Sequence, residues 1–136
     1  MIKRGIKVFS TDYKINKKYI LDRLTAEEKE MVNIKESSYE ALELPKTDLV
    51  TAFFSIPFCP PKYFDTLWAK IYDSLNDGGY FVGQLFGNRD GWSHNNSVNT
   101  FTEEKVKKYL KEYKIIKFEE KEYVRESDEK NGIIMT

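Results

Sequence analysis

The sequence predicts an α/β fold of three layers, with a mostly parallel β-sheet between helices. Short apolar runs rich in β-branched residues alternate along the chain with segments whose apolar residues recur at helical spacing. Such alternation is typical of strand–helix–strand units, which build a parallel sheet. The run 48–54 is nearly unbroken in its apolar character, so we expect a strand there that is buried on both faces.

The first half of the chain is predicted to contain three strands and one helix. Residues 6–11 form a β-branched and aromatic run that Asp12 ends, and residues 16–24 follow as a helix. Residues 31–34 and 48–54 supply the next two strands. Because ligands of parallel sheets bind beyond the carboxyl ends of the strands, functional residues are expected directly after these runs.

A helix with a pronounced apolar face is predicted after the third strand. Pro60 and Pro61 open this helix, and the Asn-Asp-Gly-Gly run 76–79 ends it before a strand over 80–86. The face must pack against the sheet, because five apolar residues recur on it at helical spacing: Phe64, Leu67, Trp68, Ile71 and Leu75.

The last third of the chain is predicted to hold one helix and two strands. Thr100 and Glu103 have the spacing of a capping box, which indicates the start of a helix. The mixed polarity of residues 115–124 favours an edge or antiparallel strand, and residues 133–136 begin another. The helix presents an apolar stripe of Val106, Tyr109, Leu110 and Tyr113. Since no linker or repeat interrupts the sequence, a single domain over 1–136 is expected.

The composition argues against nucleic acid and membranes as partners. Lys plus Arg number 22 and Asp plus Glu number 22, so the formal net charge is zero and no overall field attracts a polyanion. The longest apolar stretch falls well short of the ~20 residues that span a bilayer. A single cysteine, Cys59, excludes an internal disulfide and fits a reducing compartment, so we expect a cytoplasmic location.

Three post-strand segments are candidates for a binding site. Asp12 ends the first strand, where a carboxylate can accept hydrogen bonds from ribose hydroxyls, although aspartate is also common in turns and at helix starts. Ser38 and Tyr39 follow the second strand and suit contacts to an adenine, or equally a polar loop with a packed aromatic. The apolar segment 52–61 follows the third strand and suits either a pocket wall or core packing.

The sequence gives little support to metal or nucleophile chemistry. His94 is the only histidine and Cys59 the only cysteine, so the usual His/Cys zinc site cannot be assembled and no metal is expected. A Cys59–His94 nucleophile pair is conceivable, but a cysteine between Phe58 and Pro60 is better interpreted as a small packed residue.

Three stretches carry a resemblance to a known family: DLVTAFFSIPFCPP at 48–61, LWAKIYDSL at 67–75 and DGGYFVGQLFGNRDGW at 77–92. With them the sequence resembles the class I, Rossmann-like, S-adenosylmethionine-dependent methyltransferases, in particular the branch of the tellurite-resistance methyltransferases. The resemblance implies S-adenosylmethionine as cofactor and a small molecule as methyl acceptor.

The resemblance also implies a role for each candidate residue. The implied cofactor-binding residues are Asp12 and Tyr13 at the ribose and adenosine, Ser38 and Tyr39 at the adenine, and Ala52, Phe53 and Phe54 beside the methionine half and its methyl group. The implied substrate-side residues are Trp92 and His94, with Phe54 and Trp92 flanking the acceptor. No catalytic residue is named, because positioning and desolvation can supply much of the rate of an in-line methyl transfer.

The sequence departs from this family at both ends. Members begin with a strand and a glycine-rich loop, whereas residues 1–8 resemble the end of the helix that follows that loop, and residues 132–136 stop within the last strand. The resemblance therefore implies a chain truncated at its amino end, with exposed strand edges that invite a partner or a second copy. We expect such a chain to bind the cofactor weakly and to lack useful activity.

Two other functions stay open. A non-catalytic remnant or scaffold would keep the packed half of the fold, or would have its sheet completed by a partner. A nicotinamide-dependent dehydrogenase would use Asp12 on a dinucleotide ribose equally well. The absence of a G-x-G-x-x-G pattern and the antiparallel character of residues 115–124 count against that dehydrogenase.

Overall fold

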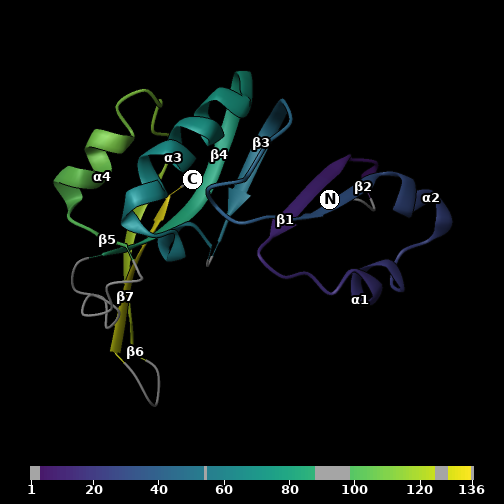
Figure 1. Ribbon diagram of the computed structural model, residues 1–136. Helices are drawn as coiled ribbons and strands as arrows, with labels where there is room; N and C mark the ends of the chain where they lie inside the picture. Colours follow the sequence, from purple (N-terminus) through teal and green to yellow (C-terminus); the bar gives the residue numbers. More distant parts are fainter. Residues whose placement is uncertain (1–3, 54, 88–98, 125–128, 136) are drawn as a thin grey trace. The chain divides into compact units, whose positions relative to one another are not determined.

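The computed structural model describes residues 4–53, 55–87, 99–124 and 129–135 of the chain (Figure 1). It divides into two compact units, Met1–Pro45 (unit 1) and Lys46–Thr136 (unit 2). Each unit is built from its own β-sheet, and no described strand of one is hydrogen-bonded to a described strand of the other.

Unit 1 is a parallel strand pair whose connection contains two short helices: β1 (Val8–Asp12), α1 (Lys17–Leu21), α2 (Ala26–Glu30) and β2 (Val32–Glu36). The strands pair in register from Val8 opposite Val32 to Asp12 opposite Glu36, so both end at the same edge. Asn16 caps α1 and Thr25 caps α2, each accepting a backbone N–H with its side-chain oxygen.

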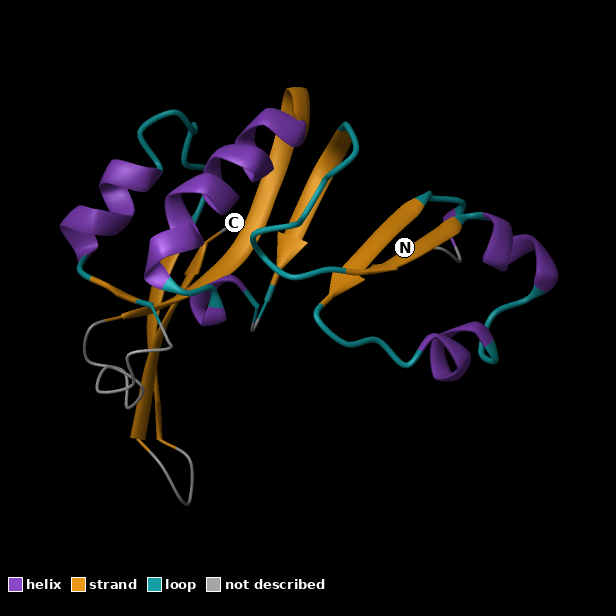
Figure 2. Cartoon of the chain, in the orientation of Figure 1, coloured by secondary structure: helices purple, strands orange, loops and turns teal. Residues whose placement is uncertain are grey.

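Unit 2 is a mixed five-stranded sheet with two helices and a 3₁₀ turn (Figure 2). The strand order is β3-β4-β7-β6, with β5 paired to the end of β4. β3 and β5 run parallel to β4, whereas β7 is antiparallel to both β4 and β6. Its elements are β3 (Thr47–Ala52), η2 (Ile56–Phe58), α3 (Pro61–Ser74), β4 (Leu75–Gly87), β5 (Thr100–Phe101), α4 (Glu103–Tyr109), β6 (Phe118–Val124) and β7 (Glu129–Met135).

The core of unit 2 lies between α3, α4 and one face of β4. Trp68 of α3 contacts Phe81 of β4 edge-on, with ring centroids 5.1 Å apart, and its indole N–H donates to the Tyr109 carbonyl at 2.9 Å. Phe64 packs against Phe101 with centroids 5.0 Å apart. Both predicted helices are confirmed, and so are the buried positions Phe64, Leu67, Trp68, Ile71, Val106 and Leu110.

The predicted α/β fold with parallel strand pairs is confirmed, and so is an antiparallel strand over the charged residues 118–124. Two details of the prediction are wrong. The 48–54 strand is not buried along its length, since Asp48, Leu49 and Thr51 of β3 are exposed, Leu49 by 41%. The run 76–79 does not separate helix from strand, because β4 already begins at Leu75. The run instead lies at an irregularity in the pairing of β4 with β3, where Gly78 has a φ of 77°.

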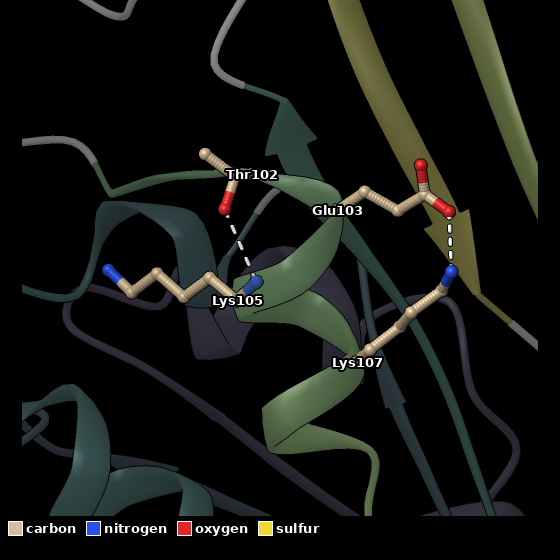
Figure 3. A network of polar contacts seen from close by, with 4 residues as sticks. All are labelled: Thr102, Glu103, Lys105 and Lys107. Atoms are coloured by element: carbon tan, nitrogen blue, oxygen red, sulfur yellow. Dashed lines mark hydrogen bonds and ion pairs between the residues drawn. The ribbon is translucent and has the colours of Figure 1, made fainter.

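The predicted capping box at Thr100 and Glu103 is also wrong. Thr100 lies in β5, paired with Phe86, and the residue that caps α4 is Thr102, whose Oγ1 accepts the N–H of Lys105 at 3.2 Å (Figure 3). Glu103 instead pairs with Lys107 one turn along the helix, at 2.7 Å. The one capping box in the described part of the chain joins Thr25 and Glu28 in α2, a helix that the sequence pattern did not predict.

Candidate functional site

The carboxyl edge of the β1–β2 pair brings two carboxylates together. Asp12 ends β1 and Glu36 ends β2, and the parallel register places them opposite each other. A further backbone hydrogen bond joins the two strands at this edge, because the N–H of Ser37 donates to the Asp12 carbonyl at 2.9 Å. Both side chains are exposed, so the edge offers acceptor oxygens to a ligand.

The two carboxylates organise the loop that follows β1. Asp12 Oδ1 accepts the N–H of Tyr13 at 2.7 Å, and Glu36 Oε1 accepts the N–H of Ile15 at 3.1 Å. Tyr13 is 70% exposed beside Asp12, so its ring is available to cover a bound group. The sequence predicted Asp12 and Tyr13 but not Glu36, because Lys35-Glu36-Ser37 has the polarity of an ordinary loop.

Ser38 and Tyr39 lie in the turn after β2, at the same edge as Asp12. Both are half-buried, and the Ser38 carbonyl accepts the hydroxyl of Ser37 at 3.0 Å. The structure therefore brings four predicted residues of unit 1 to one edge: Asp12, Tyr13, Ser38 and Tyr39.

The remaining predicted residues belong to unit 2 or lie outside the described residues. Ala52 ends β3 and is buried, and Phe53 directly after it is 47% exposed. Phe54, Trp92 and His94 lie outside the described residues.

Cys59 is fully buried, as expected for a packed residue. The side chain of Asn99 donates to the Cys59 carbonyl at 2.6 Å, and its backbone N–H donates to the Pro57 carbonyl at 2.7 Å. Asn99 is 4% exposed and thereby ties the segment after β3 to the start of β5. This structural role was not predicted, since nothing in the local sequence distinguishes Asn99 from a loop residue.

Two cavities of unit 2 have none of the described predicted site residues among their lining residues. One of about 480 Å³ lies between α3 and α4, and the other of about 280 Å³ lies between the start of β4 and the segment after α4. Burial and, to a lesser extent, the neighbouring Tyr72 together raise the pKa of Tyr113, which lines both cavities, to about 12. Burial and a hydrogen bond to Asp65 raise the pKa of Tyr109 to about 12 as well. These pKa shifts follow from packing between the helices.

Within the described residues, no cluster of three or more His, Cys, Asp or Glu side chains is arranged to hold a metal ion. The helices described are also too short or too polar for any of them to cross a membrane.

No protein-family model matches the sequence, and no curated protein matches it significantly. Solved structures do match. TehB from Haemophilus influenzae superposes with a TM-score of 0.74 at 17% identity, over 96% of this chain and 49% of that chain.

Two further solved structures, both of methyltransferases, also superpose on this chain. A Burkholderia thailandensis 1,6-didemethyltoxoflavin-N1-methyltransferase, with bound 1,6-didemethyltoxoflavin and S-adenosylhomocysteine, gives a TM-score of 0.70 at 16% identity, over 98% of this chain and 61% of that chain. A Thermotoga maritima S-adenosylmethionine-dependent methyltransferase, a possible histamine N-methyltransferase, gives a TM-score of 0.61 at 14% identity, over 98% of this chain and 73% of that chain. The chain spans about half the length of TehB. The chain has the fold of the class I S-adenosylmethionine-dependent methyltransferases, as its resemblance to that family implied.

Proposed function

We propose that this chain is part of an S-adenosylmethionine-dependent methyltransferase that acts on a small molecule. The observation that carries the proposal is Asp12 at the carboxyl edge of a parallel strand pair, in a chain with the fold of such enzymes. The Burkholderia enzyme, whose structure holds a small heteroaromatic substrate and S-adenosylhomocysteine, supports this substrate class and cofactor.

The residues at the edge of unit 1 fit the adenosine half of the cofactor. Asp12 uses Oδ1 for the amide of Tyr13, and each carboxylate oxygen accepts more than one hydrogen bond, so ribose hydroxyls can still be held. Tyr13 beside it is exposed enough to cover the adenosine, and Ser38 and Tyr39 lie where the adenine would be lined.

The other site residues are assigned by the same proposal. Ala52, Phe53 and Phe54 would lie beside the methionine half, and Trp92 and His94 would form the substrate side. When bound, the cofactor supplies a methyl group on a sulfonium. The chain's own residues would orient the two reactants and exclude water, which lowers the barrier of an in-line displacement without a dedicated base.

We further propose that this chain binds the cofactor weakly by itself. Its 136 residues contain no G-x-G-x-x-G pattern, so no described segment provides backbone N–H groups in a glycine-rich loop for the methionine carboxylate. The contacts available to Asp12 and its neighbours concern only the adenosine half. We expect the two units to form one domain of a cytoplasmic protein.

Calorimetry with S-adenosylhomocysteine tests the proposal on this chain and on the longer protein of which we propose it is a part, called the full-length protein below. In the full-length protein Asp12→Ala should weaken binding by roughly tenfold or more, because a hydrogen bond to a charged group contributes about 1.5–3 kcal/mol. Asp22→Ala, which removes an exposed carboxylate elsewhere in unit 1, is the control. Unchanged affinity of a folded Asp12→Ala protein would remove Asp12 from the site, and micromolar binding by the 136-residue chain would contradict the weak affinity.

A second candidate function is a non-catalytic scaffold whose sheet a partner completes. Among the described strands, β1 is hydrogen-bonded only to β2, and β3 only to β4, so each presents one unpaired edge. Such edges invite pairing with another strand, including one from a second copy. Light scattering over a concentration series distinguishes the candidates, because a scaffold of this kind should self-associate or recruit its partner without cofactor. The antiparallel β6–β7 pair counts against the dehydrogenase alternative.

A further inference from the structure

Three side-chain oxygens hold the chain from Asp12 to Tyr19 in one conformation. Asp12 accepts the N–H of its neighbour Tyr13, and Asn16 accepts the N–H of Tyr19 at 3.0 Å. These two contacts are local, with sequence separations of one and three residues. The third contact differs, because Glu36 accepts the N–H of Ile15 across a separation of 21 residues.

The Glu36 contact joins the loop after β1 to the neighbouring strand. Ile15 lies midway between Asp12, where β1 ends, and Lys17, where α1 begins. Local contacts at Tyr13 and Tyr19 fix the two ends of this segment but do not tie its middle to the sheet. A carboxylate is a strong acceptor for a backbone N–H, so Glu36 supplies the missing tie.

We propose that Glu36 is a positioning residue that fixes the β1–α1 loop, and with it Tyr13 and the Asp12 carboxylate, in the geometry of the adenosine site. This inference rests on the proposed function for the purpose of the loop, whereas the tie between Glu36 and Ile15 stands on the contact alone. Preorganisation of this kind raises affinity, because the loop is already ordered when the ligand arrives.

The proposal separates Glu36 from Asp12 by the way each acts. Asp12 would touch the ligand directly, so any loss of its charge weakens binding. Glu36 acts through the amide of Ile15, and a neutral amide oxygen at the same place still accepts that hydrogen bond. Glu36→Gln should therefore keep most of the protection of the Ile15 amide, and most of the cofactor affinity, that Glu36→Ala loses.

Amide hydrogen exchange of the ligand-free chain, followed by NMR, tests the tie itself. Glu36→Ala should raise the exchange rate of the Ile15 amide by about tenfold or more, while the Tyr19 amide, held by Asn16, stays unchanged. Glu36→Gln should raise it by less than about threefold. Glu43→Ala, an exposed carboxylate of unit 1 in a loop, is the matched control for the change in charge and should leave the Ile15 amide as it is. Unaltered exchange at Ile15 in Glu36→Ala would overturn the proposal.

Calorimetry with S-adenosylhomocysteine on the full-length protein tests the consequence. Glu36→Ala should lose roughly tenfold in affinity and Glu36→Gln should stay close to the wild type. Equal losses in both variants, with Ile15 still protected in Glu36→Gln, would show that Glu36 touches the ligand and would overturn the positioning role. If the wild type itself does not bind, the proposed function fails, and the exchange measurement still decides whether Glu36 fixes the loop.

Discussion

The two units of this chain are held together by different interactions. Neither α1 nor α2 of unit 1 has a buried residue, and in the described chain Leu42 is the only buried hydrophobic residue of that unit. Its order comes from strand pairing and from side-chain oxygens that accept backbone N–H groups. Unit 2 has a core of interlocking rings around Trp68, Phe64 and Phe81. The unit that carries Asp12, Tyr13, Ser38 and Tyr39 is thus the one with the smaller hydrophobic core.

The largest effect is expected from Trp68→Ala in the core of unit 2. Removing the indole leaves a cavity beside Phe64 and Phe81 and frees the Tyr109 carbonyl, so the free energy of unfolding should fall by about 3–5 kcal/mol. Urea denaturation followed by circular dichroism measures the change. Tyr19→Ala, a 54% exposed aromatic of unit 1, is the control and should cost far less. Similar losses of unfolding free energy in the two variants would show that the two units do not differ in this way.

Alkaline pH should destabilise unit 2 selectively. Tyr109 and Tyr113 have pKa values raised to about 12, whereas an unfolded tyrosine ionises near 10, so their stabilisation is complete below pH 10 and is lost as the pH rises to 12. The loss of unfolding free energy is at most about 3 kcal/mol for each tyrosine and should be smaller, because solvent screens these partly exposed groups. Denaturation at several pH values should show a shallower loss for the double variant Tyr109→Phe and Tyr113→Phe. If the free energy of unfolding fell equally steeply with pH in the wild type and the double variant, groups other than these two tyrosines would govern the loss between pH 10 and pH 12.

The helix caps allow a matched test across the units. Thr25 and Thr102 cap α2 and α4 with the same side-chain oxygen, at 3.2 Å from the accepted N–H in each case. Replacing either by Ala should cost about 1 kcal/mol locally. We expect Thr102→Ala to lower the free energy of global unfolding of unit 2. Thr25→Ala should instead appear as faster amide exchange within α2. Serine at each position is the control, because it retains the hydroxyl.

The smallest effect is expected for the Glu103–Lys107 ion pair on α4. Lys107 lowers the pKa of Glu103 through a hydrogen bond and its charge, but both side chains are largely exposed. Solvent and salt screen such pairs. Lys107→Met should leave the unfolding midpoint unchanged within error, both at low salt and in 1 M salt. A clear loss of stability at low salt alone would show that this helix depends on its surface charges.

The sequence predicted the strongly periodic elements and failed where short polar signals compete. Phe64, Trp68 and Ile71 identify α3, because a buried face must repeat at helical spacing. None of the five residues of α2 is buried. Its N-cap Thr25 has the same spacing to Glu28 as Thr100 has to Glu103, so this capping signal is easily overlooked. Only the pairing of Thr100 with Phe86, a contact between separate segments, rules out the second pair as a cap.

At the candidate site, too, the sequence pattern could predict some residues and not others. Asp12 is recognisable because it directly ends a run of β-branched and aromatic residues. Glu36 ends a strand of only five residues in which exposed and half-buried positions alternate, so its place at the edge becomes clear only from the register with Asp12. Partners of this kind depend on pairing between strands, which the local pattern does not encode.

The strand order of unit 2 sets a sequence of events during synthesis. β7 lies between β4 and β6 in the sheet but follows β6 along the chain. On the ribosome, β6 therefore emerges before the strand that joins it to β4. It must wait as a charged, unpaired segment until residues 129–135 have cleared the exit tunnel, and only then can the sheet close by antiparallel pairing. A pause in translation before residue 129 would therefore delay the closing of this sheet beyond β4.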